Sequence, residues 1–300
     1  MNTMQNYNYQ DSSEEFLLKF FDKPQSQKEE EISQILAENP PWPILYHLHP
    51  QRNFILSWYP LKKNASLLEI GAGCGAITGM LCERVRKVVA VELTKERADI
   101  IKKRFVDKKN LKVFAGNFNE LSLKEKFDYI TLIGVLEYQG RYTKSSSNDI
   151  DEPYVNFLKE VKNYLKKNGK LLIAIENKIG LKYLAGGRED HYGSLFESIE
   201  NYPNYSGIKT FTKNEIEEIL KKAGFERFKF YYPYPDYKLP YFILTEDGYN
   251  LNLANSLMSQ IKDLSQERLF LFNESLFFKS LKKEKILDKF SNSFLIECQI

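Results

Sequence analysis

The stretch Ser66-Leu67-Leu68-Glu69-Ile70-Gly71-Ala72-Gly73-Cys74-Gly75 carries the clearest structural signal in this 300-residue chain. Its first half is an apolar strand that contains one acid, and its second half is a glycine-rich turn. Such a turn at the carboxyl end of a parallel strand lets a ligand approach bare backbone, while the following helix presents free N–H groups. The pattern predicts a nucleotide-type cofactor site. With Ala76, it also satisfies the looser dinucleotide pattern G-x-G-x-x-A.

Two neighbouring features distinguish a dinucleotide from S-adenosylmethionine. Gly75 extends the pattern to G-x-G-x-G, and Glu69 places a charge in the strand where a dinucleotide site has no need of one. A second strand, Lys87-Val88-Val89-Ala90-Val91-Glu92, ends in a carboxylate at the distance downstream where a ribose-binding acid is expected. The residues therefore favour S-adenosylmethionine as the cofactor. The alternative is that Glu69 and Glu92 are solvated strand-end charges.

From about residue 66 to its C-terminus, the chain resembles the class I S-adenosylmethionine-dependent methyltransferases. The resemblance implies that residues 71–75 wrap the methionine part of the cofactor and that Glu92 holds the ribose. It implies that Asn117, in Phe114-Ala115-Gly116-Asn117-Phe118, contacts adenine in place of the more usual aspartate. Residues 127–138 are similar to the family's fourth strand and the turn beside the transferable methyl group. The predicted cofactor-binding residues are Glu69, Gly71, Ala72, Gly73, Gly75, Glu92, Leu93, Asn117, Phe118 and Gly134.

Alternating strand and helix signals predict an α/β, Rossmann-like sheet of seven strands with an antiparallel last strand. The last strand is expected at Phe290-Ser291-Asn292-Ser293-Phe294-Leu295-Ile296-Glu297-Cys298, because apolar and polar positions alternate there. The family resemblance implies that this strand pairs between the fifth and the sixth. Tyr241-Phe242-Ile243-Leu244-Thr245 is the shorter, competing segment. The other strands are expected near residues 66–70, 87–92, 111–114, 127–133, 170–176 and 225–232.

The expected domains are a helical N-terminal cap and one methyltransferase domain with substrate-side insertions. The cap covers residues 1–60, and the domain covers residues 61–300. The insertions are expected near residues 177–210 and 234–289.

Composition limits the class of protein. A hydrophobic content of 43% allows a full core, and 43 basic against 40 acidic residues give a net charge of +3, which disfavours nucleic acid as a partner. Cys74, Cys82 and Cys298 are too few and too widely spaced for a disulfide framework or a C-x-x-C metal site. Residues 1–10 lack a signal-peptide core, and no run of eighteen apolar residues occurs, so we expect no membrane insertion and a cytoplasmic location. The oligomeric state stays open.

Residues 177–193, after the expected fifth strand, carry four glycines and many polar side chains. They follow the carboxyl end of a central strand, where open α/β sheets bind ligands. One interpretation is a functional lid, and the other is a surface excursion with solvated charges.

Within this segment, His191 is the leading candidate for the base that a hydroxyl acceptor requires, because its unperturbed pKa lies near working pH. The alternative is a structural histidine. Asp190, Glu189 and Glu176 are expected to orient the ring or to act as the base themselves. Arg188 is expected to bind an anionic part of the acceptor or to pair with Glu189.

No metal site is expected. His47 and His49 suggest a metal pair, but the chain shows no third matching ligand.

The run Tyr231-Tyr232-Pro233-Tyr234-Pro235-Asp236-Tyr237 offers rigid aromatic faces with hydroxyl tips, which suit a sugar, although packing against the sheet edge is an equal alternative. A closer resemblance, to a bacterial methyltransferase subgroup associated with glycosyltransferases of cell-surface polysaccharide assembly, rests on other segments. They are Tyr46-His47-Leu48 with Pro50 and Arg52, residues 69–79, residues 175–183, Arg188-Glu189-Asp190-His191 and Phe290-Ser291-Asn292-Ser293-Phe294. The resemblance implies O-methylation of a sugar or glycan-type acceptor. Methylation of a peptide or small natural product is one alternative, and a non-catalytic, cofactor-binding partner protein is another. The predicted catalytic residues are His191, Asp190 and Glu176, and the predicted substrate residues are Arg188, Tyr192 and Tyr234.

Overall fold

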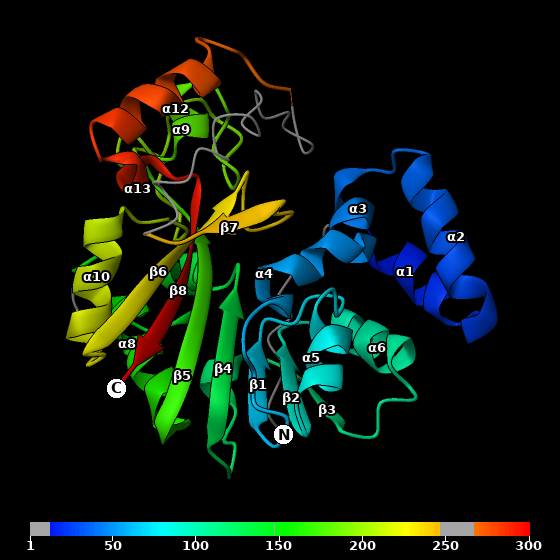
Figure 1. Ribbon diagram of the computed structural model, residues 1–300. Coiled ribbons are helices and arrows are strands. Elements are labelled where there is room, and N and C mark those ends of the chain that lie inside the picture. The colour runs from blue at the N-terminus through cyan, green and yellow to red at the C-terminus, as the bar shows by residue number, and fades with distance from the viewer. Residues whose placement is uncertain (1–12, 147, 247–266) are drawn as a thin grey trace. The chain divides into compact units, whose positions relative to one another are not determined.

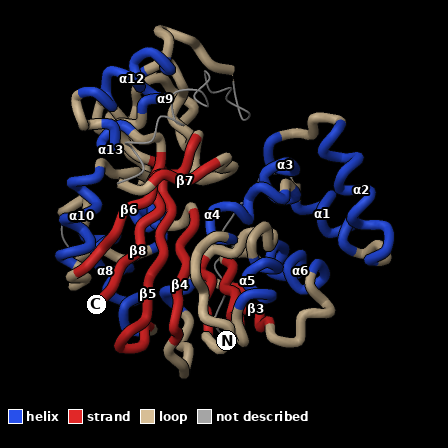
Figure 2. The backbone as a smooth tube through the Cα atoms, in the orientation of Figure 1, coloured by secondary structure: helices blue, strands red, loops and turns tan. Residues whose placement is uncertain are grey.

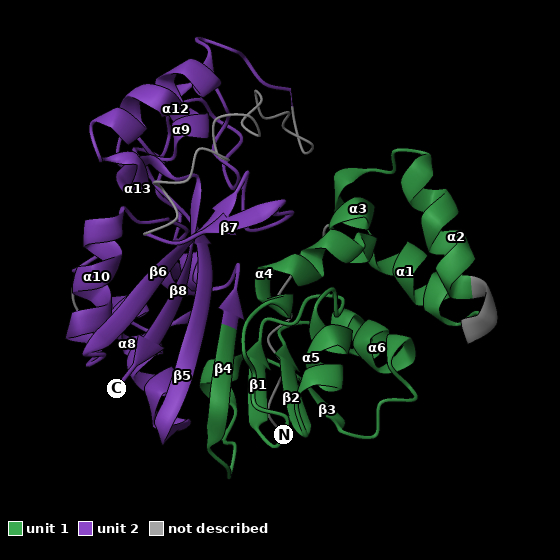
Figure 3. Cartoon of the chain, viewed as in Figure 1, with its two compact units in different colours: residues 1–131 green, residues 132–300 purple. Residues whose placement is uncertain are grey.

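The computed structural model describes residues 13–146, 148–246 and 267–300, and the chain falls into two compact units (Figure 3). The first unit extends to Thr131, and the second begins at Leu132. Strand β4 (Phe127–Ile133) runs through this boundary.

The first unit carries parallel strands that the sequence predicts closely. They are β1 (Ser66–Ile70), β2 (Lys87–Glu92) and β3 (Leu111–Ala115). β1 pairs with β2 and β2 with β3, both in parallel, with Leu68 opposite Val89 and Ala90 opposite Val113. Every residue of β1 is buried, as is typical of a strand covered on both faces. The helices near these strands are α5 (Thr78–Arg84), α6 (Lys95–Arg104) and the short η2 (Phe118–Glu120) (Figure 1).

A helical segment precedes β1 and packs within the same unit. Its helices are α1 (Glu14–Phe21), α2 (Gln25–Ala37), α3 (Trp42–Leu48), η1 (Pro50–Asn53) and α4 (Phe54–Ser57). Leu17, Phe20 and Leu48 form a buried cluster with Cys74 of the glycine turn. The guanidinium of half-buried Arg104 donates to the carbonyl oxygens of His47, at 2.9 Å, and Cys74, at 3.0 Å. The helical segment is therefore anchored to the turn. A separate cap ending at residue 60 stays a prediction.

The second unit contains the remaining strands, β5 (Leu165–Glu176), β6 (Arg227–Tyr234), β7 (Phe242–Leu244) and β8 (Ser293–Gln299). Its helices are η3 (Leu136–Tyr138), α7 (Gln139–Tyr142), α8 (Glu152–Asn163), α9 (Leu181–Leu184), α10 (Lys213–Lys222), α12 (Glu274–Lys283) and α13 (Leu287–Phe290). A capping box between Thr212 and Glu215 begins α10, because each side chain accepts from the other residue's backbone N–H.

The strand order through the described residues is β3-β2-β1-β4-β5-β8-β6-β7, which makes a mixed, eight-stranded sheet. β8 lies antiparallel between β5 and β6, with Ile296 opposite both Ile173 and Phe230, so the predicted position of the antiparallel strand is confirmed (Figure 2). The predicted number of seven strands is wrong by one. The competing segment also forms a strand, β7, because Ile243 pairs with Pro233 along β6.

Within the described ranges, the structure contains no helix that is both long enough and apolar enough to cross a bilayer.

Candidate active site

The glycine turn after β1 adopts backbone conformations that favour glycine. Gly71, Gly73 and Gly75 have φ angles of 72°, 56° and 79°. Gly75 also lacks room for a side chain, because a Cβ atom there would lie 2.7 Å from the Phe105 ring. Gly71 N donates to Val91 O at 2.8 Å, which ties the start of the turn to β2. The predicted turn is therefore present, with exposed backbone at the end of a buried strand.

The two acids that flank this turn are buried, so the interpretation of solvated strand-end charges is wrong. Glu69 is 2% exposed, and its Oε2 accepts from Thr78 Oγ1 at 2.7 Å. Glu92 is 3% exposed, and its Oε2 accepts from Gly73 N at 2.7 Å. Burial raises the pKa of Glu69 to about 8. Burial also raises the pKa of Glu92, although the charge of Arg97 opposes this.

The remaining predicted cofactor residues occupy different places. Asn117 is buried, and its Oδ1 accepts from Asn119 N at 3.1 Å, so the amide oxygen expected for adenine caps η2. Phe118 is buried at the start of η2, and Leu93 is half-buried after β2. Gly134 belongs to the second unit, where its N–H donates to Ala174 O at 2.9 Å. Contact of these residues with a cofactor stays a prediction.

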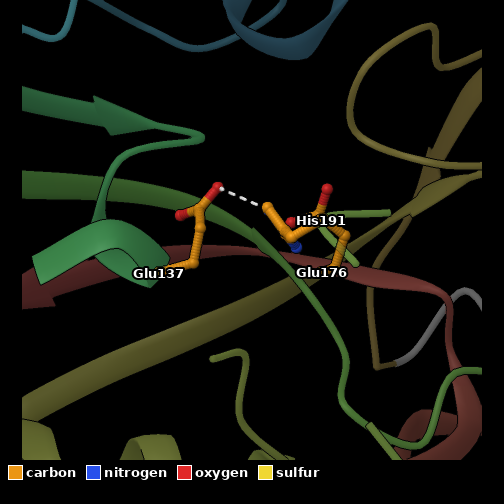
Figure 4. A group of neighbouring side chains, drawn as sticks. All are labelled: Glu137, Glu176 and His191. Atoms are coloured by element: carbon orange, nitrogen blue, oxygen red, sulfur yellow. Dashed lines mark ion pairs between the residues drawn. The ribbon is translucent and has the colours of Figure 1, made fainter. Parts of the chain in front are cut away.

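In the second unit, three side chains from separate segments point toward one another (Figure 4). Glu137 lies in η3, Glu176 is the last residue of β5, and His191 lies in the segment after α9. One nitrogen or oxygen atom from each lies within 4.8 Å of the other two. His191 Nε2 lies 3.8 Å from Glu137 Oε1, and His191 Nδ1 lies 2.9 Å from Glu189 Oε1. Glu189 is therefore the acid that orients the ring.

The neighbouring charges are half-buried and paired, which contradicts the interpretation of a surface excursion with solvated charges. Lys182 Nζ lies 2.6 Å from Asp190 Oδ2 and 2.9 Å from Asp236 Oδ2. Lys238 Nζ forms an ion pair with Glu176 Oε1. Asp190 also accepts from the Tyr183 hydroxyl, so the structure records its contacts with lysines and a tyrosine rather than with the His191 ring.

The environment of His191 disfavours the predicted role as a base. Burial by itself would lower the pKa of His191, but hydrogen bonds with Glu137 and Glu189 and the charges of Glu176 and Glu189 raise this pKa well above its ordinary value. A ring that holds its proton more tightly is less available to accept a proton from a hydroxyl. Sequence reasoning missed Glu137, whose available signal was an acid four residues beyond the end of β4.

Each of the three predicted substrate residues contacts other parts of the protein. Arg188 is exposed, and its Nη1 donates to Gly193 O at 3.0 Å. The Tyr192 hydroxyl donates to Ile208 O at 2.8 Å. Tyr234 stacks on Phe242 with 5.0 Å between ring centroids and lines a largely apolar pocket with Leu181. Packing accounts for Tyr234, and substrate contact by the three residues stays a prediction.

Comparison with known proteins identifies the fold and the chain's family. A model of the methyltransferase domain family matches residues 45–228, which is more than half of the chain. The chain belongs to the methyltransferase domain family. Membership of this family confirms three predictions: the Rossmann-like architecture, that the protein is an enzyme, and that its cofactor is S-adenosylmethionine.

Relatives of this methyltransferase have diverse names. A ribosomal RNA small subunit methyltransferase A from Fusobacterium nucleatum is 30% identical over 136 residues, covering 41% of this chain and 51% of that protein. A ubiquinone biosynthesis O-methyltransferase from Pelagibacter ubique is 35% identical over 128 residues, covering 42% and 47%. The chain thus spans about half the length of these two relatives. A ribosomal RNA small subunit methyltransferase A from Mycoplasma mobile is 28% identical, covering 82% of this chain and 85% of that protein.

Solved structures support the fold alone. Phosphoethanolamine N-methyltransferase 1 from Haemonchus contortus, in complex with phosphoethanolamine and S-adenosylhomocysteine, has a TM-score of 0.50 at 14% identity, covering 96% of this chain and 48% of that one. A Haloferax volcanii complex of the Trm112 methyltransferase activator with a methyltransferase gives a TM-score of 0.50 at 11% identity, covering 97% and 99%.

Proposed function

We propose that this methyltransferase transfers the methyl group of S-adenosylmethionine to a hydroxyl group of a sugar or glycan-type acceptor. The supporting observation is a pair of buried carboxylate oxygens, Glu137 Oε2 and Glu176 Oε2, that have no hydrogen-bond partner among the described residues. Leaving such acceptors unpaired is unfavourable by about 1–3 kcal/mol each, more for charged groups. An acceptor with several hydroxyl groups would satisfy them.

The predicted catalytic residues take modified roles in this proposal. Glu176, together with Glu137, accepts a hydrogen bond from the hydroxyl of the acceptor and serves as the base in place of His191. Asp190 acts as a positioning residue. Its ion pair with Lys182 ties together two parts of the segment that carries His191. Arg188, Tyr192 and Tyr234 are proposed to contact more distant parts of the acceptor. The resemblance to the polysaccharide-associated subgroup supports a glycan, and a cytoplasmic enzyme acting on a precursor fits this role.

Methylation of RNA is the second candidate function, because several relatives are named as ribosomal RNA methyltransferases. The charge of the second unit's cluster opposes it. A polyanion needs lysine and arginine partners for its phosphates, whereas this cluster has more carboxylates than cations. A peptide or small natural product remains an alternative acceptor of the same reaction, and a non-catalytic partner protein remains the alternative from another class.

Methyl incorporation from labelled S-adenosylmethionine tests these proposals. Sugar nucleotides, lipid-linked glycans, peptides and small-subunit ribosomal RNA would be offered separately, and we expect label in a glycan-type acceptor. Glu176→Gln should lower turnover by about a hundredfold or more, in the range for loss of a general base. Glu197→Gln is the matched control, because Glu197 is buried in the same unit but both of its oxygens accept from Asn204.

Each other result assigns a different function. Label in RNA alone would replace the proposal with RNA methylation. Tight cofactor binding without transfer to any acceptor class would favour the non-catalytic partner protein.

A further inference from the structure

The side chains of Glu137, Glu176 and His191 supply two carboxylates and an imidazole from three separate segments of the second unit (Figure 4). Glu137 is 1% exposed, Glu176 is fully buried, and the His191 side chain is 5% exposed. These three groups are common metal ligands, and the three residues do not form a short motif in the sequence. The fold therefore creates the arrangement.

The region around these three side chains contains more negative than positive groups. Lys182 pairs with Asp190 at 2.6 Å and with Asp236 at 2.9 Å. Lys238 pairs with Glu176 and lies 3.5–3.6 Å from Asp236 and Asp190. Five carboxylates therefore face two ammonium groups and one imidazole. The ionisable side chains of this region, buried or half-buried, are Glu137, Glu176, Glu189, Asp190, Asp236, Lys182, Lys238 and His191. Buried carboxylates need cations or hydrogen-bond donors. In this region the carboxylates outnumber the cations, and two carboxylate oxygens also lack a donor among the described residues.

Two atoms identify where the missing cation would bind. Glu137 Oε2 and Glu176 Oε2 are buried and have no hydrogen-bond partner among the described residues. Both belong to side chains that lie together with the ring of His191. This observation is independent of the excess of acids, because a carboxylate cluster can satisfy all of its oxygens with protein donors, as Glu197 does with Asn204.

The support behind His191 matches that of a metal-binding histidine. Glu189 Oε1 lies 2.9 Å from Nδ1 and orients the ring so that Nε2 lies on the side of Glu137. Glu189 is itself fixed, because its Oε2 accepts from the backbone N–H groups of His191, at 2.6 Å, and Tyr192, at 2.8 Å. A carboxylate on the second ring nitrogen is the usual partner of a ligating histidine.

We propose that Glu137, Glu176 and His191 bind a divalent transition-metal cation such as Mn²⁺ or Zn²⁺. A mixed imidazole and carboxylate set suits these ions better than Mg²⁺ or Ca²⁺, which prefer oxygen ligands throughout. The separation of 3.8 Å between His191 Nε2 and Glu137 Oε1 equals that of two ligand bonds of about 2.1 Å opened to an angle of about 130°. A closing movement of about half an ångström would bring the two atoms to tetrahedral geometry.

An ion at this position would compensate the excess negative charge of the region. It would also keep coordination positions open for oxygen atoms of water or of an acceptor. With the ion bound, Glu137 and Glu176 would act on an acceptor hydroxyl through the ion rather than by direct contact, and the ion would lower the pKa of that hydroxyl. This catalytic role rests on the proposed function. Binding of the ion itself does not, because it is measured without cofactor or acceptor.

Metal uptake by the full-length protein tests the proposal directly. After treatment with EDTA, the protein would be dialysed against Mn²⁺, Zn²⁺, Mg²⁺ or Ca²⁺ alone, and bound metal would be measured by elemental analysis. We expect one Mn²⁺ or Zn²⁺ per chain. Glu137→Gln and Glu176→Gln should each weaken binding by about a hundredfold, and Glu189→Gln, which keeps all three ligands, by about 10–100-fold. Glu197→Gln should bind as the wild type does.

The proposal is overturned if the wild type takes up none of the four ions in stoichiometric amount. It is also overturned if Glu137→Gln and Glu176→Gln retain wild-type affinity, since the ion would then lie elsewhere. Circular dichroism would establish that each variant is folded before dialysis. If either ligand variant fails to fold, two other measurements decide the question. Glu189→Gln should bind the ion more weakly than the wild type. The electron paramagnetic resonance spectrum of bound Mn²⁺ should show a nitrogen coupling that His191→Ala abolishes.

Discussion

Glu69 should make the stability of the cofactor-free protein decrease as the solution becomes more alkaline. Burial raises the pKa of Glu69 from 4.5 to about 8, although the hydrogen bond from Thr78 acts in the opposite direction. Between these two values the folded chain holds a proton that the unfolded chain has released. The folded state therefore binds the proton more tightly, so this contribution to stability is fully present below pH 4.5 and is lost as the pH rises through 8.

The magnitude follows from the two pKa values. Each pH unit between them contributes about 1.4 kcal/mol to the free energy of unfolding. At pH 6 the protonated carboxyl therefore stabilises the folded state by roughly 2–3 kcal/mol, and at pH 9 almost nothing remains. Glu69→Gln removes this dependence, because the amide does not titrate and its oxygen can still accept from Thr78 Oγ1. The difference in stability between the wild type and Glu69→Gln should change by that amount over this interval.

Urea unfolding at pH 6, 7, 8 and 9 measures this difference, and other titrating groups largely cancel in the comparison. Thr78→Val provides a second check. The hydroxyl of Thr78 donates to Glu69 and so lowers the pKa of Glu69. Without this hydroxyl the pKa should rise, and the loss of stability should shift to higher pH. A difference between wild type and Glu69→Gln that stays constant from pH 6 to 9 would refute the reasoning, since Glu69 would then be ionised throughout.

Three further predictions concern the first unit and the cysteines. Glu92→Ala should weaken S-adenosylmethionine binding by about 2–3 kcal/mol in calorimetry, because the ribose and Gly73 N lose a charged acceptor, and NAD binding in place of S-adenosylmethionine would contradict this. Gly75→Ala should destabilise the fold by about 1–3 kcal/mol in thermal unfolding, and by more than Gly73→Ala, where φ is also positive but the nearest atom to a new Cβ lies 3.5 Å away. All three cysteines are buried thiols, and burial raises the pKa of Cys82 to about 12, so Ellman's reagent should react only after denaturation; rapid reaction of the native protein would show an exposed thiol.

Local patterns in the sequence were sufficient for the strands and the turn of the first unit. Residues 66–70 and 87–92 were predicted with the bounds that the structure has. Both are short apolar runs that end at residues with special backbone or charge requirements, so nearest-neighbour chemistry defines them. The capping box at Thr212 was predictable for the same reason, because its bonds join residues three apart.

Pairing between distant segments was only partly predictable. The alternation in residues 290–298 identified a strand, and the family resemblance gave its place in the sheet. The sequence treats residues 241–245 as a competitor of the last strand, whereas the structure contains both strands and pairs β7 with β6. A strand of three residues is too short for its pattern to show whether it forms an additional edge strand.

The charged cluster depended on the tertiary structure. The sequence pointed to His191, Asp190 and Glu176 as chemically suitable residues, but it contained no information on which acid would lie beside which base. Folding placed Glu189 on the ring, directed Asp190 to Lys182, and brought in Glu137 from 54 residues before His191. Although burial acts to lower the pKa of His191, the acidic partners that folding placed around the ring raised this pKa. Residue types and spacing determine which groups are available, whereas burial and long-range contacts determine their charge and their partners.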